Sequence, residues 1–258
     1  IGNDDLNMIS KLTALTSLSV DANVFTDLAP LSALTNLTYL SVSDNGLRDV
    51  EGLSALTKLK TLVAADNQII DPQGVAGIAS VSVLDLSGNQ LSSIVNLAPL
   101  TRLTDLNLSG NRISSLDGMS AFASLRTLDL SANSLTDIEP LSALRNLDVL
   151  DLSRNRIKDY TPLSQTKLTS LKATHNSISD LEGIASIRTL RTLNVATNMI
   201  TSVRPLENLP ELAELDISNN MISRLSPLTG CPSLHTVTCG GNPARDAERL
   251  AENGITLQ

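Results

Sequence analysis

Residues 128–144 read Leu-Asp-Leu-Ser-Ala-Asn-Ser-Leu-Thr-Asp-Ile-Glu-Pro-Leu-Ser-Ala-Leu, and nearly all of the chain repeats this stretch. One asparagine marks each copy, and successive asparagines lie 22 residues apart except for one interval of 21. They are Asn23, Asn45, Asn67, Asn89, Asn111, Asn133, Asn155, Asn176, Asn198, Asn220 and Asn242. Such a period predicts a solenoid, in which each repeat buries its apolar residues against its neighbours. We expect one repeat domain over residues 1–242 that starts inside a repeat, because Ile1 occupies an asparagine position.

The amino-acid composition indicates the kind of core, and the net charge indicates the kind of binding partner. Hydrophobic residues make up 41% of the 258 residues but aromatic residues only 2%, which predicts a core of leucine layers. The net charge of -8 argues against a nucleic-acid or anionic-membrane partner, since affinity for either comes largely from Lys and Arg. It favours a protein partner with a basic surface.

Cysteine usage and hydropathy bear on the compartment. Cys231 and Cys239 are too few for a disulfide-stapled scaffold, which favours the cytoplasm. No apolar stretch approaches the roughly 20 residues of a spanning helix, so we expect no membrane insertion. A cell-surface location stays open if a signal or anchor was removed.

Each repeat contains a short strand before its asparagine. The eleven apolar-x-apolar motifs, such as Leu128-Asp129-Leu130, predict strands whose middle residue points outward. The asparagine amide is expected to bind backbone groups of its own turn and of the next coil. An aspartate four residues later is expected to cap a short 3-10 or helical turn, as at Asp27, Asp49, Asp137, Asp159 and Asp180.

These motifs carry a family resemblance. Residues 137–144, Asp-Ile-Glu-Pro-Leu-Ser-Ala-Leu, resemble the repeats of bacterial internalins. Val50-Glu51-Gly52-Leu53 and Leu181-Glu182-Gly183-Ile184 are similar to those of the leucine-rich regulatory subunit of protein phosphatase 1. The resemblance covers practically the whole chain and implies the 22-residue subclass of leucine-rich repeats. It implies an α/β, mostly β solenoid: a right-handed horseshoe with 3-10 turns outside and a parallel concave sheet of about 11 strands, one for each motif.

Three places depart from the pattern. The segment 161–168 lacks one residue and predicts loosening on the convex side. Residues 1–17 read as the tail of a repeat, without a separate N-terminal cap. Residues 243–258 predict a cap: a short amphipathic helix ended by Gly254, and a possible last strand at residues 255–257.

The outward residues of the strands are the candidate partner-binding surface. They cluster as an acidic patch in mid-arc with Arg154, Lys172 and His175 immediately C-terminal. The candidate residues are Tyr39, Asp85, Asp105, Asn107, Asp129, Asp151, Arg154, Lys172, His175, Asn194, Glu214 and Asp216. Within residues 128–144 we expect Asp129 and its outward neighbours to be free to vary, because the others build the core or the turn.

Catalytic and metal chemistry find little support. Asp129 and Asp151 on adjacent strands would be spaced like the carboxylates of a retaining glycosidase, but an open wall offers no pocket, so a solvated acidic face is the better interpretation. Cys231, His235 and Cys239 cannot converge as zinc requires, because His235 falls on an outward position. No nucleophile accompanies His175. We therefore predict no catalytic residue, no metal and no cofactor.

Three functions stay open. The first is a monomeric, non-catalytic protein-interaction domain that acts as a scaffold or regulatory subunit through its acidic concave face. The second is an internalin-like bacterial surface protein that binds a host receptor, which the Pro-Leu repeats favour. The third is the recognition domain of a larger enzyme.

Overall fold

The computed structural model describes residues 2–258, which form two compact units. The N-terminal unit comprises residues 2–133 and the C-terminal unit residues 134–258. Ile1, which we interpreted as occupying an asparagine position, lies outside the described residues. Among the described residues, every helix is too short or too polar to cross a membrane.

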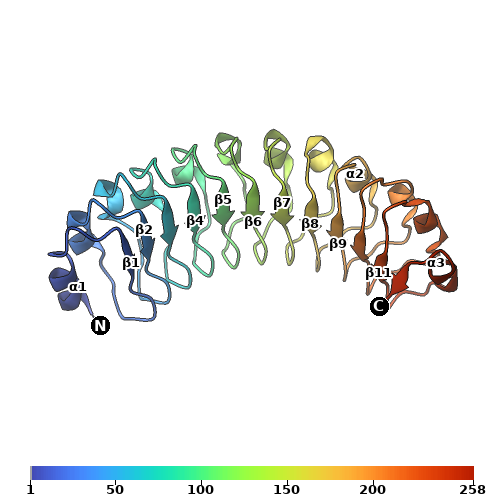
Figure 1. Cartoon of the computed structure of the whole chain (residues 1–258), viewed down its shortest axis with the longest axis horizontal. Helices are drawn as coiled ribbons and strands as arrows, with labels where there is room; N and C mark the ends of the chain where they lie inside the picture. The colour runs from blue at the N-terminus through green and yellow to red at the C-terminus, as the bar shows by residue number, and fades with distance from the viewer. Residues whose placement is uncertain (1) are drawn as a thin grey trace. The chain divides into compact units, whose positions relative to one another are not determined.

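The N-terminal unit is a stack of coils that each contribute one strand. Its strands are β1 (Ser17–Ser19), β2 (Tyr39–Ser41), β3 (Thr61–Val63), β4 (Val83–Asp85), β5 (Asp105–Asn107) and β6 (Thr127–Asp129). Its helices are α1 (Asn3–Ile9) and the 3-10 helices η1 (Ala29–Ala33), η2 (Leu53–Ala55), η3 (Gln73–Val75), η4 (Val95–Leu97) and η5 (Met119–Ala121). The strands pair in parallel in chain order, and equivalent repeat positions are in register, as Leu62 is with Leu84 (Figure 1).

The C-terminal unit repeats this arrangement. Its strands are β7 (Val149–Asp151), β8 (Ser170–Lys172), β9 (Thr192–Asn194), β10 (Glu214–Asp216), β11 (Thr236–Thr238) and β12 (Thr256–Leu257). Its helices are η6 (Glu139–Ala143), η7 (Thr161–Gln165), α2 (Glu182–Ala185), η8 (Arg204–Leu206), η9 (Ser226–Gly230) and α3 (Glu248–Glu252). The strands are again parallel and in chain order.

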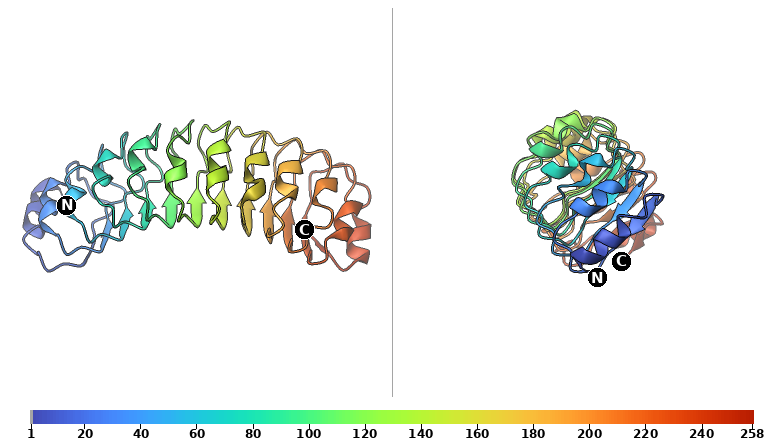
Figure 2. Two further views of the ribbon diagram at one scale, coloured as in Figure 1. Left: turned by 90° about the horizontal axis from the view of Figure 1, so that it is seen from above. Right: turned by 90° about the vertical axis from the view of Figure 1, so that its left-hand side faces the viewer.

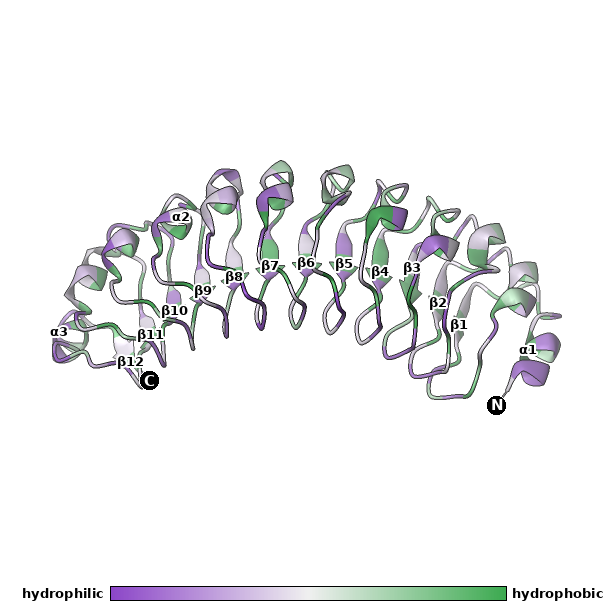
Figure 3. Cartoon of the chain, turned by 180° about the vertical axis from the view of Figure 1, so that it is seen from behind, coloured by the Kyte–Doolittle hydropathy of each residue, from purple (hydrophilic) through white to green (hydrophobic). Residues whose placement is uncertain are grey.

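Each unit has two layers with the leucine core between them. Strands occupy one face and short helices the other (Figure 2). Leu128 and Leu130 are buried, whereas Asp129 between them is half-buried, so the predicted alternation is confirmed. Apolar and polar residues alternate in the same way along the other coils (Figure 3). The predicted solenoid class, with parallel strands on one face and 3-10 turns on the other, is confirmed in each unit.

Each repeat asparagine holds two coils together. Asn67 Nδ2 donates to the carbonyls of Ala64 at 3.2 Å and Ala65 at 3.0 Å in its own turn, and to Val42 at 3.0 Å. Its Oδ1 accepts the N–H of Leu47 at 3.2 Å. The predicted bonds within the turn are confirmed, but the second coil is the preceding one rather than the next. An asparagine side chain is therefore necessary here, because it supplies both donors and an acceptor.

The predicted aspartate caps are confirmed. The Oδ1 atoms of Asp27, Asp137 and Asp159 each accept the backbone N–H two residues later at 2.8 Å, where a 3-10 helix begins. Asp49 and Asp180 make the same bond at 3.0 and 3.1 Å. The carboxylates thus satisfy backbone donors that a short helix leaves unpaired.

The shortened repeat is not loosened as predicted. η7 is a regular 3-10 helix that packs between η6 and α2. The missing residue is absorbed at Thr166, whose ψ of 167° is extended where Leu144, at the same repeat position, has 69°. Buried Thr166 also donates from Oγ1 to the Leu163 carbonyl at 2.6 Å. One backbone rotation shortens the coil without opening the core.

Residues 3–9 form the helix α1, which packs against η1 through buried Leu6, 22 residues before buried Leu28, and the prediction that they are the tail of a repeat stays a prediction. At the other end the predicted short helix before Gly254 is α3, which begins at Glu248. The Asp246 carboxylate accepts the backbone N–H groups of Leu225 and Ser226. The possible last strand is present as β12, paired with β11.

Candidate functional site

The candidate surface is built by the strands. In each three-residue strand the central residue faces the core, and the first and last residues face outward. We call these outward side chains the strand face of each unit. Since neighbouring parallel strands are in register, the first residues align in one row and the last residues in a second.

The N-terminal unit brings three of the predicted residues into direct register. Asp85, Asn107 and Asp129 occupy the last-residue row of β4, β5 and β6. Asp105 lies in the first-residue row of β5. Tyr39 is 38% exposed on β2 and is separated from Asp105 by β3 and β4. The structure therefore groups the polar residues and leaves the tyrosine apart.

The strand-face carboxylates also have a structural task. Asp85 Oδ1 accepts the Ser87 N–H at 2.9 Å and the Ser87 hydroxyl at 2.6 Å. Asp129 Oδ1 accepts the Ser131 N–H at 2.8 Å, and Asn107 makes the equivalent bond to Ser109 at 3.1 Å. The carboxylate of Asp129 thus closes the turn after β6, and Asn107 shows that asparagine makes the same bond. Since Val63 and Lys172 occupy the same repeat position, the expectation that Asp129 is free to vary stays a prediction.

The C-terminal unit forms a hollow over β8 to β12. Its last-residue row runs in register from Asp151 through Lys172, Asn194 and Asp216 to Thr238. Side chains of this row and of the neighbouring first-residue row enclose about 450 Å³. The polar lining residues are Ser170, Lys172, Thr192, Asn194, Glu214, Asp216, Thr236, Thr238 and Gln258. Four predicted residues are thus brought together at one place.

Opposite charges lie at separate positions in this hollow. Lys172 is exposed on β8, and exposed Glu214 lies beside half-buried Asp216 on β10. Asn194 lies between them on β9, and its Nδ2 donates to Asp216 Oδ2 at 3.1 Å. Among the described residues the one ion pair is between Arg191 and Glu211, at 3.2 Å, so neither Lys172 nor Glu214 is neutralised by a salt bridge.

Three predicted residues of the C-terminal unit lie outside the hollow. Asp151 is half-buried at the end of β7, where its Oδ1 accepts the Ser153 N–H at 2.8 Å. Arg154 and His175 are exposed in the turns after β7 and β8, with positive φ angles of 57° and 52°. These two side chains do not line the hollow.

The candidate residues leave out five lining residues, which are Ser170, Thr192, Thr236, Thr238 and Gln258. Four of them belong to the two outward rows that strand alternation predicts, and taking every residue of these rows as a candidate would have included them. Gln258 would not have been included, because β12 begins 20 residues after β11 and falls outside the 22-residue period.

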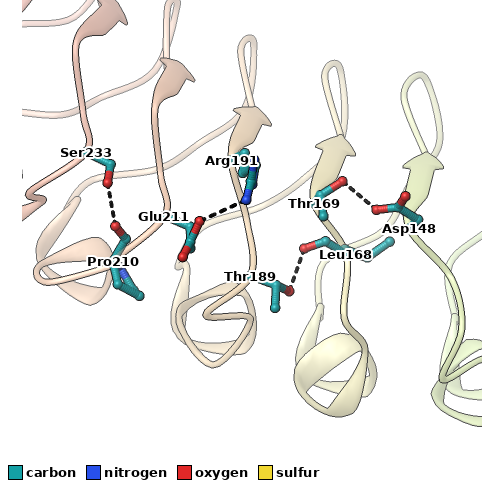
Figure 4. Close-up of polar contacts among 8 residues, drawn as sticks. All are labelled: Asp148, Leu168, Thr169, Thr189, Arg191, Pro210, Glu211 and Ser233. Carbon is teal, nitrogen blue, oxygen red and sulfur yellow. Dashed lines mark hydrogen bonds and ion pairs between the residues drawn. The ribbon is translucent and has the colours of Figure 1, made fainter.

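The side on which the chain enters the strands is occupied by contacts between coils (Figure 4). Ser233 Oγ donates to the Pro210 carbonyl at 2.7 Å, and Thr189 Oγ1 donates to the Leu168 carbonyl at 2.8 Å. The Arg191–Glu211 ion pair bridges two coils on the same side. These polar contacts link neighbouring coils of the C-terminal unit.

The cysteine and histidine pattern does not assemble a centre. Cys231 is buried and its thiol donates to the Leu206 carbonyl at 3.1 Å, whereas Cys239 is half-buried. Burial raises the pKa of both thiols. His235 is exposed. Within residues 2–258 no three His, Cys, Asp or Glu side chains are grouped closely enough to hold a metal ion.

Comparison with known proteins identifies a protein family and several similar structures. A family model described as Leucine Rich repeats (2 copies) matches residues 35–76, 80–121, 123–165 and 210–252. Comparison with curated proteins found no match.

Several solved structures are similar. An internalin of Listeria monocytogenes has 24% sequence identity and a TM-score of 0.83, over 98% of this chain and 93% of that chain. Internalin C2 of the same organism has 32% identity and a TM-score of 0.62, over 82% of this chain and 83% of that chain. The plant peptide hormone receptor RGFR1, solved in complex with RGF2, has 18% identity and a TM-score of 0.66, over 92% of this chain and 45% of that chain.

The repeat period, the asparagine contacts, the parallel strands and the family model agree. Repeats of this kind stack into extended surfaces that serve protein–protein interaction. The chain therefore belongs to the leucine-rich-repeat family and resembles the internalins.

Proposed function

We propose that the chain is a non-catalytic binding domain that recognises a protein partner with a basic surface through its strand face. The observation that carries this proposal is the hollow over β8 to β12, where Glu214 and Asp216 lie exposed or half-buried beside hydroxyl and amide groups. Elsewhere in the coils polar side chains bind the backbone, as Asn67 does. The hollow offers polar groups that are available to a second molecule.

Charge supports the choice of partner. In Asp129 and Asp151 the bonds to the turn use Oδ1, so Oδ2 is available to a cation. The net charge of -8 adds a long-range field that accelerates encounter with a basic partner. The related fold of a plant receptor, solved in complex with a peptide hormone, supports a peptide or protein ligand.

An internalin-like surface protein that binds a host receptor is the second candidate. Its support is the 32% identity to internalin C2 over 82% of this chain. The full-length reading frame separates the candidates: a signal peptide with a wall anchor supports the second, and a fused catalytic domain supports recognition within a larger enzyme.

A peptide selection tests the strand-face proposal. The purified chain is used as bait for a phage-displayed library of random peptides. We expect enrichment of peptides rich in Lys and Arg, because the hollow is acidic on β10. A variant carrying Glu214→Lys and Asp216→Asn should bind these peptides about tenfold more weakly, a change of about 1.4 kcal/mol.

The matched control changes charge equally on the opposite face. It carries Glu182→Lys in α2 and Glu139→Gln in η6, both exposed, and should bind like the unmodified chain. Equal binding by the strand-face variant, or an absence of any enriched peptide, would contradict the proposal. Hydrolase activity in the purified chain would contradict its non-catalytic part.

A further inference from the structure

The hollow over β8 to β12 is lined by one cationic side chain, Lys172, and two carboxylates, Glu214 and Asp216. Lys172 and Glu214 both line it, yet no ion pair joins them in the part of the chain that the structure describes. Neither side chain is engaged in a hydrogen bond to a turn, in contrast to Asp216, whose Oδ1 accepts the Ser218 N–H at 3.0 Å. The two charges are held apart by β9.

Strand geometry sets their separation. Lys172 is on β8 and Glu214 on β10, so two steps of the sheet separate their backbones. At about 4.8 Å per step, this is roughly 10 Å across the strands, and because Lys172 is the last residue of β8 and Glu214 the first of β10, they are also about 7 Å apart along the strands, or roughly 12 Å in all. An extended chain rises about 3.3 Å per residue and points every second side chain to the same face, so side chains four residues apart share one face at about 13 Å.

We propose that this hollow recognises an extended peptide in which an acidic and a basic side chain lie four residues apart. The acidic side chain pairs with Lys172, and the basic one pairs with Glu214 and Asp216. This inference rests on the proposed function and deepens it by specifying the charge pattern of the partner.

The other groups around the hollow are consistent with this pattern. Asp151 is the neighbour of Lys172 in the row, but it does not line the hollow and its Oδ1 is bonded to the turn. Asn194 lies midway and is uncharged. The hydroxyl of Thr238 lines the remaining wall and can donate to a peptide carbonyl, whereas Thr192 Oγ1 donates to Ser170 Oγ at 2.8 Å and Thr236 Oγ1 lies 3.0 Å from His235 Nδ1.

Synthetic peptides of equal net charge test the spacing. One carries Glu and Lys four residues apart, a second carries them at adjacent positions, and a third carries Gln at both. We expect the chain to bind the first about fivefold more tightly than the second or third in calorimetry, because two partly exposed ion pairs contribute little each. Equal affinity for the first and second peptides would overturn the inference.

Charge exchange gives a sharper test. The variant Lys172→Glu should prefer a peptide with two lysines, and the variant Glu214→Lys with Asp216→Asn should prefer one with two glutamates. Combining all three substitutions places a negative charge at position 172 and a positive charge at position 214. This variant should again prefer the peptide that carries one Glu and one Lys. A combined variant that fails to recover this preference would contradict the inference, provided that its thermal unfolding matches that of the unmodified chain.

The outcomes distinguish this inference from the broader proposal. Binding of basic peptides without a spacing preference would refute the dipolar pattern and retain the strand-face proposal. An absence of peptide binding would refute both. A dimer of the chain that Lys172→Glu dissociates in sedimentation would identify a second copy as the occupant, and would also overturn the inference.

Discussion

At the residue scale, the residue before each repeat asparagine has a left-handed backbone, which the sequence pattern does not reveal. The preceding residue has a positive φ in every coil, including Asp44 at 51°, Ala132 at 53° and Thr197 at 57°. Left-handed backbone costs a residue with a side chain about 1–2 kcal/mol, so glycine would be expected there. Glycine occurs at only some of these positions, such as Gly88 and Gly110. The four bonds of the following asparagine stabilise the turn enough to hold the others.

Tyr160 is the exception to complete hydrogen bonding. Its ring is buried at the repeat position that Ile138 occupies one coil earlier. Among the described residues its hydroxyl is the one buried side-chain polar atom without a hydrogen-bond partner. Burial, together with the charge of Asp151, raises the pKa of Tyr160, so the hydroxyl stays protonated.

Removing this hydroxyl should therefore stabilise the protein. We expect Tyr160→Phe to raise the free energy of unfolding by about 1 kcal/mol, because a buried unpaired polar group costs about 1–3 kcal/mol. Urea unfolding followed by circular dichroism measures the change. The control Tyr39→Phe, on an exposed side chain, should leave stability unchanged. A loss of stability in Tyr160→Phe would show that the hydroxyl is satisfied in solution.

At the element scale, the recurring Pro or Gly near the start of each short helix serves different purposes. Pro140 and Pro162 lie in the first turn of η6 and η7, where proline's fixed φ suits a helix and its missing N–H costs nothing. Gly52 needs its positive φ of 85°. Gly183 instead needs space, because an added Cβ would lie 2.3 Å from the Thr161 nitrogen of the preceding coil. One sequence position thus satisfies unrelated physical requirements.

This close approach makes Gly183 sensitive to substitution. We expect Gly183→Ala to lower the free energy of unfolding by about 2 kcal/mol, because α2 must move away from η7 to admit the methyl group. Chemical denaturation measures the loss. Gly240 has no heavy atom within 4 Å of an added Cβ, so Gly240→Ala is the control and should change stability little. Similar effects of the two substitutions would exclude the steric explanation.

The C-terminal segment is joined to η9 by one carboxylate. Burial alone would raise the pKa of Asp246, but hydrogen bonds from Leu225 and Ser226 outweigh it and lower the pKa below its usual value. A lowered pKa means that this stabilisation is complete above the unfolded-state pKa of about 3.9 and is lost as pH falls through the folded-state value.

The pH dependence of unfolding tests this link. We expect the unmodified chain to lose more stability below about pH 4 than the variant Asp246→Asn, which has no carboxylate to protonate. Denaturant titrations across a pH series measure the difference. Ser223→Ala, a nearby substitution without a titratable group, is the control and should follow the unmodified chain. Parallel pH profiles for Asp246→Asn and the unmodified chain would contradict the assignment.

At the scale of the whole molecule, the repeat period predicted the fold class, the core positions, the strands and the capping aspartates. It failed where a repeat departs from the pattern. The shortened coil closes through the backbone at Thr166 instead of loosening, and residues 3–9 form a seven-residue α-helix. Neither outcome is visible in apolar spacing, because each depends on how one backbone segment packs against the neighbouring coil.

The sequence predicted where the candidate site lies, but not which of its side chains are occupied by hydrogen bonds to the backbone. The rows of outward residues follow from strand alternation, and they include Lys172, Asn194, Glu214 and Asp216. Sequence analysis predicted an acidic patch in mid-arc beside Arg154, Lys172 and His175. The structure separates Asp129 and Asp151, which close their own turns, from Glu214, which does not. It also adds Gln258, which directly follows β12.

The sequence by itself determined that this chain is a leucine-rich-repeat solenoid, because a 22-residue period leaves its apolar residues no other partner than the next copy. Only the tertiary structure decided which polar side chains remain available to a second molecule. The physical reason is that backbone donors and acceptors compete for those side chains. The hydrogen bonds that occupy these side chains join them to backbone groups two positions away in a turn, or twenty or more positions away in another coil.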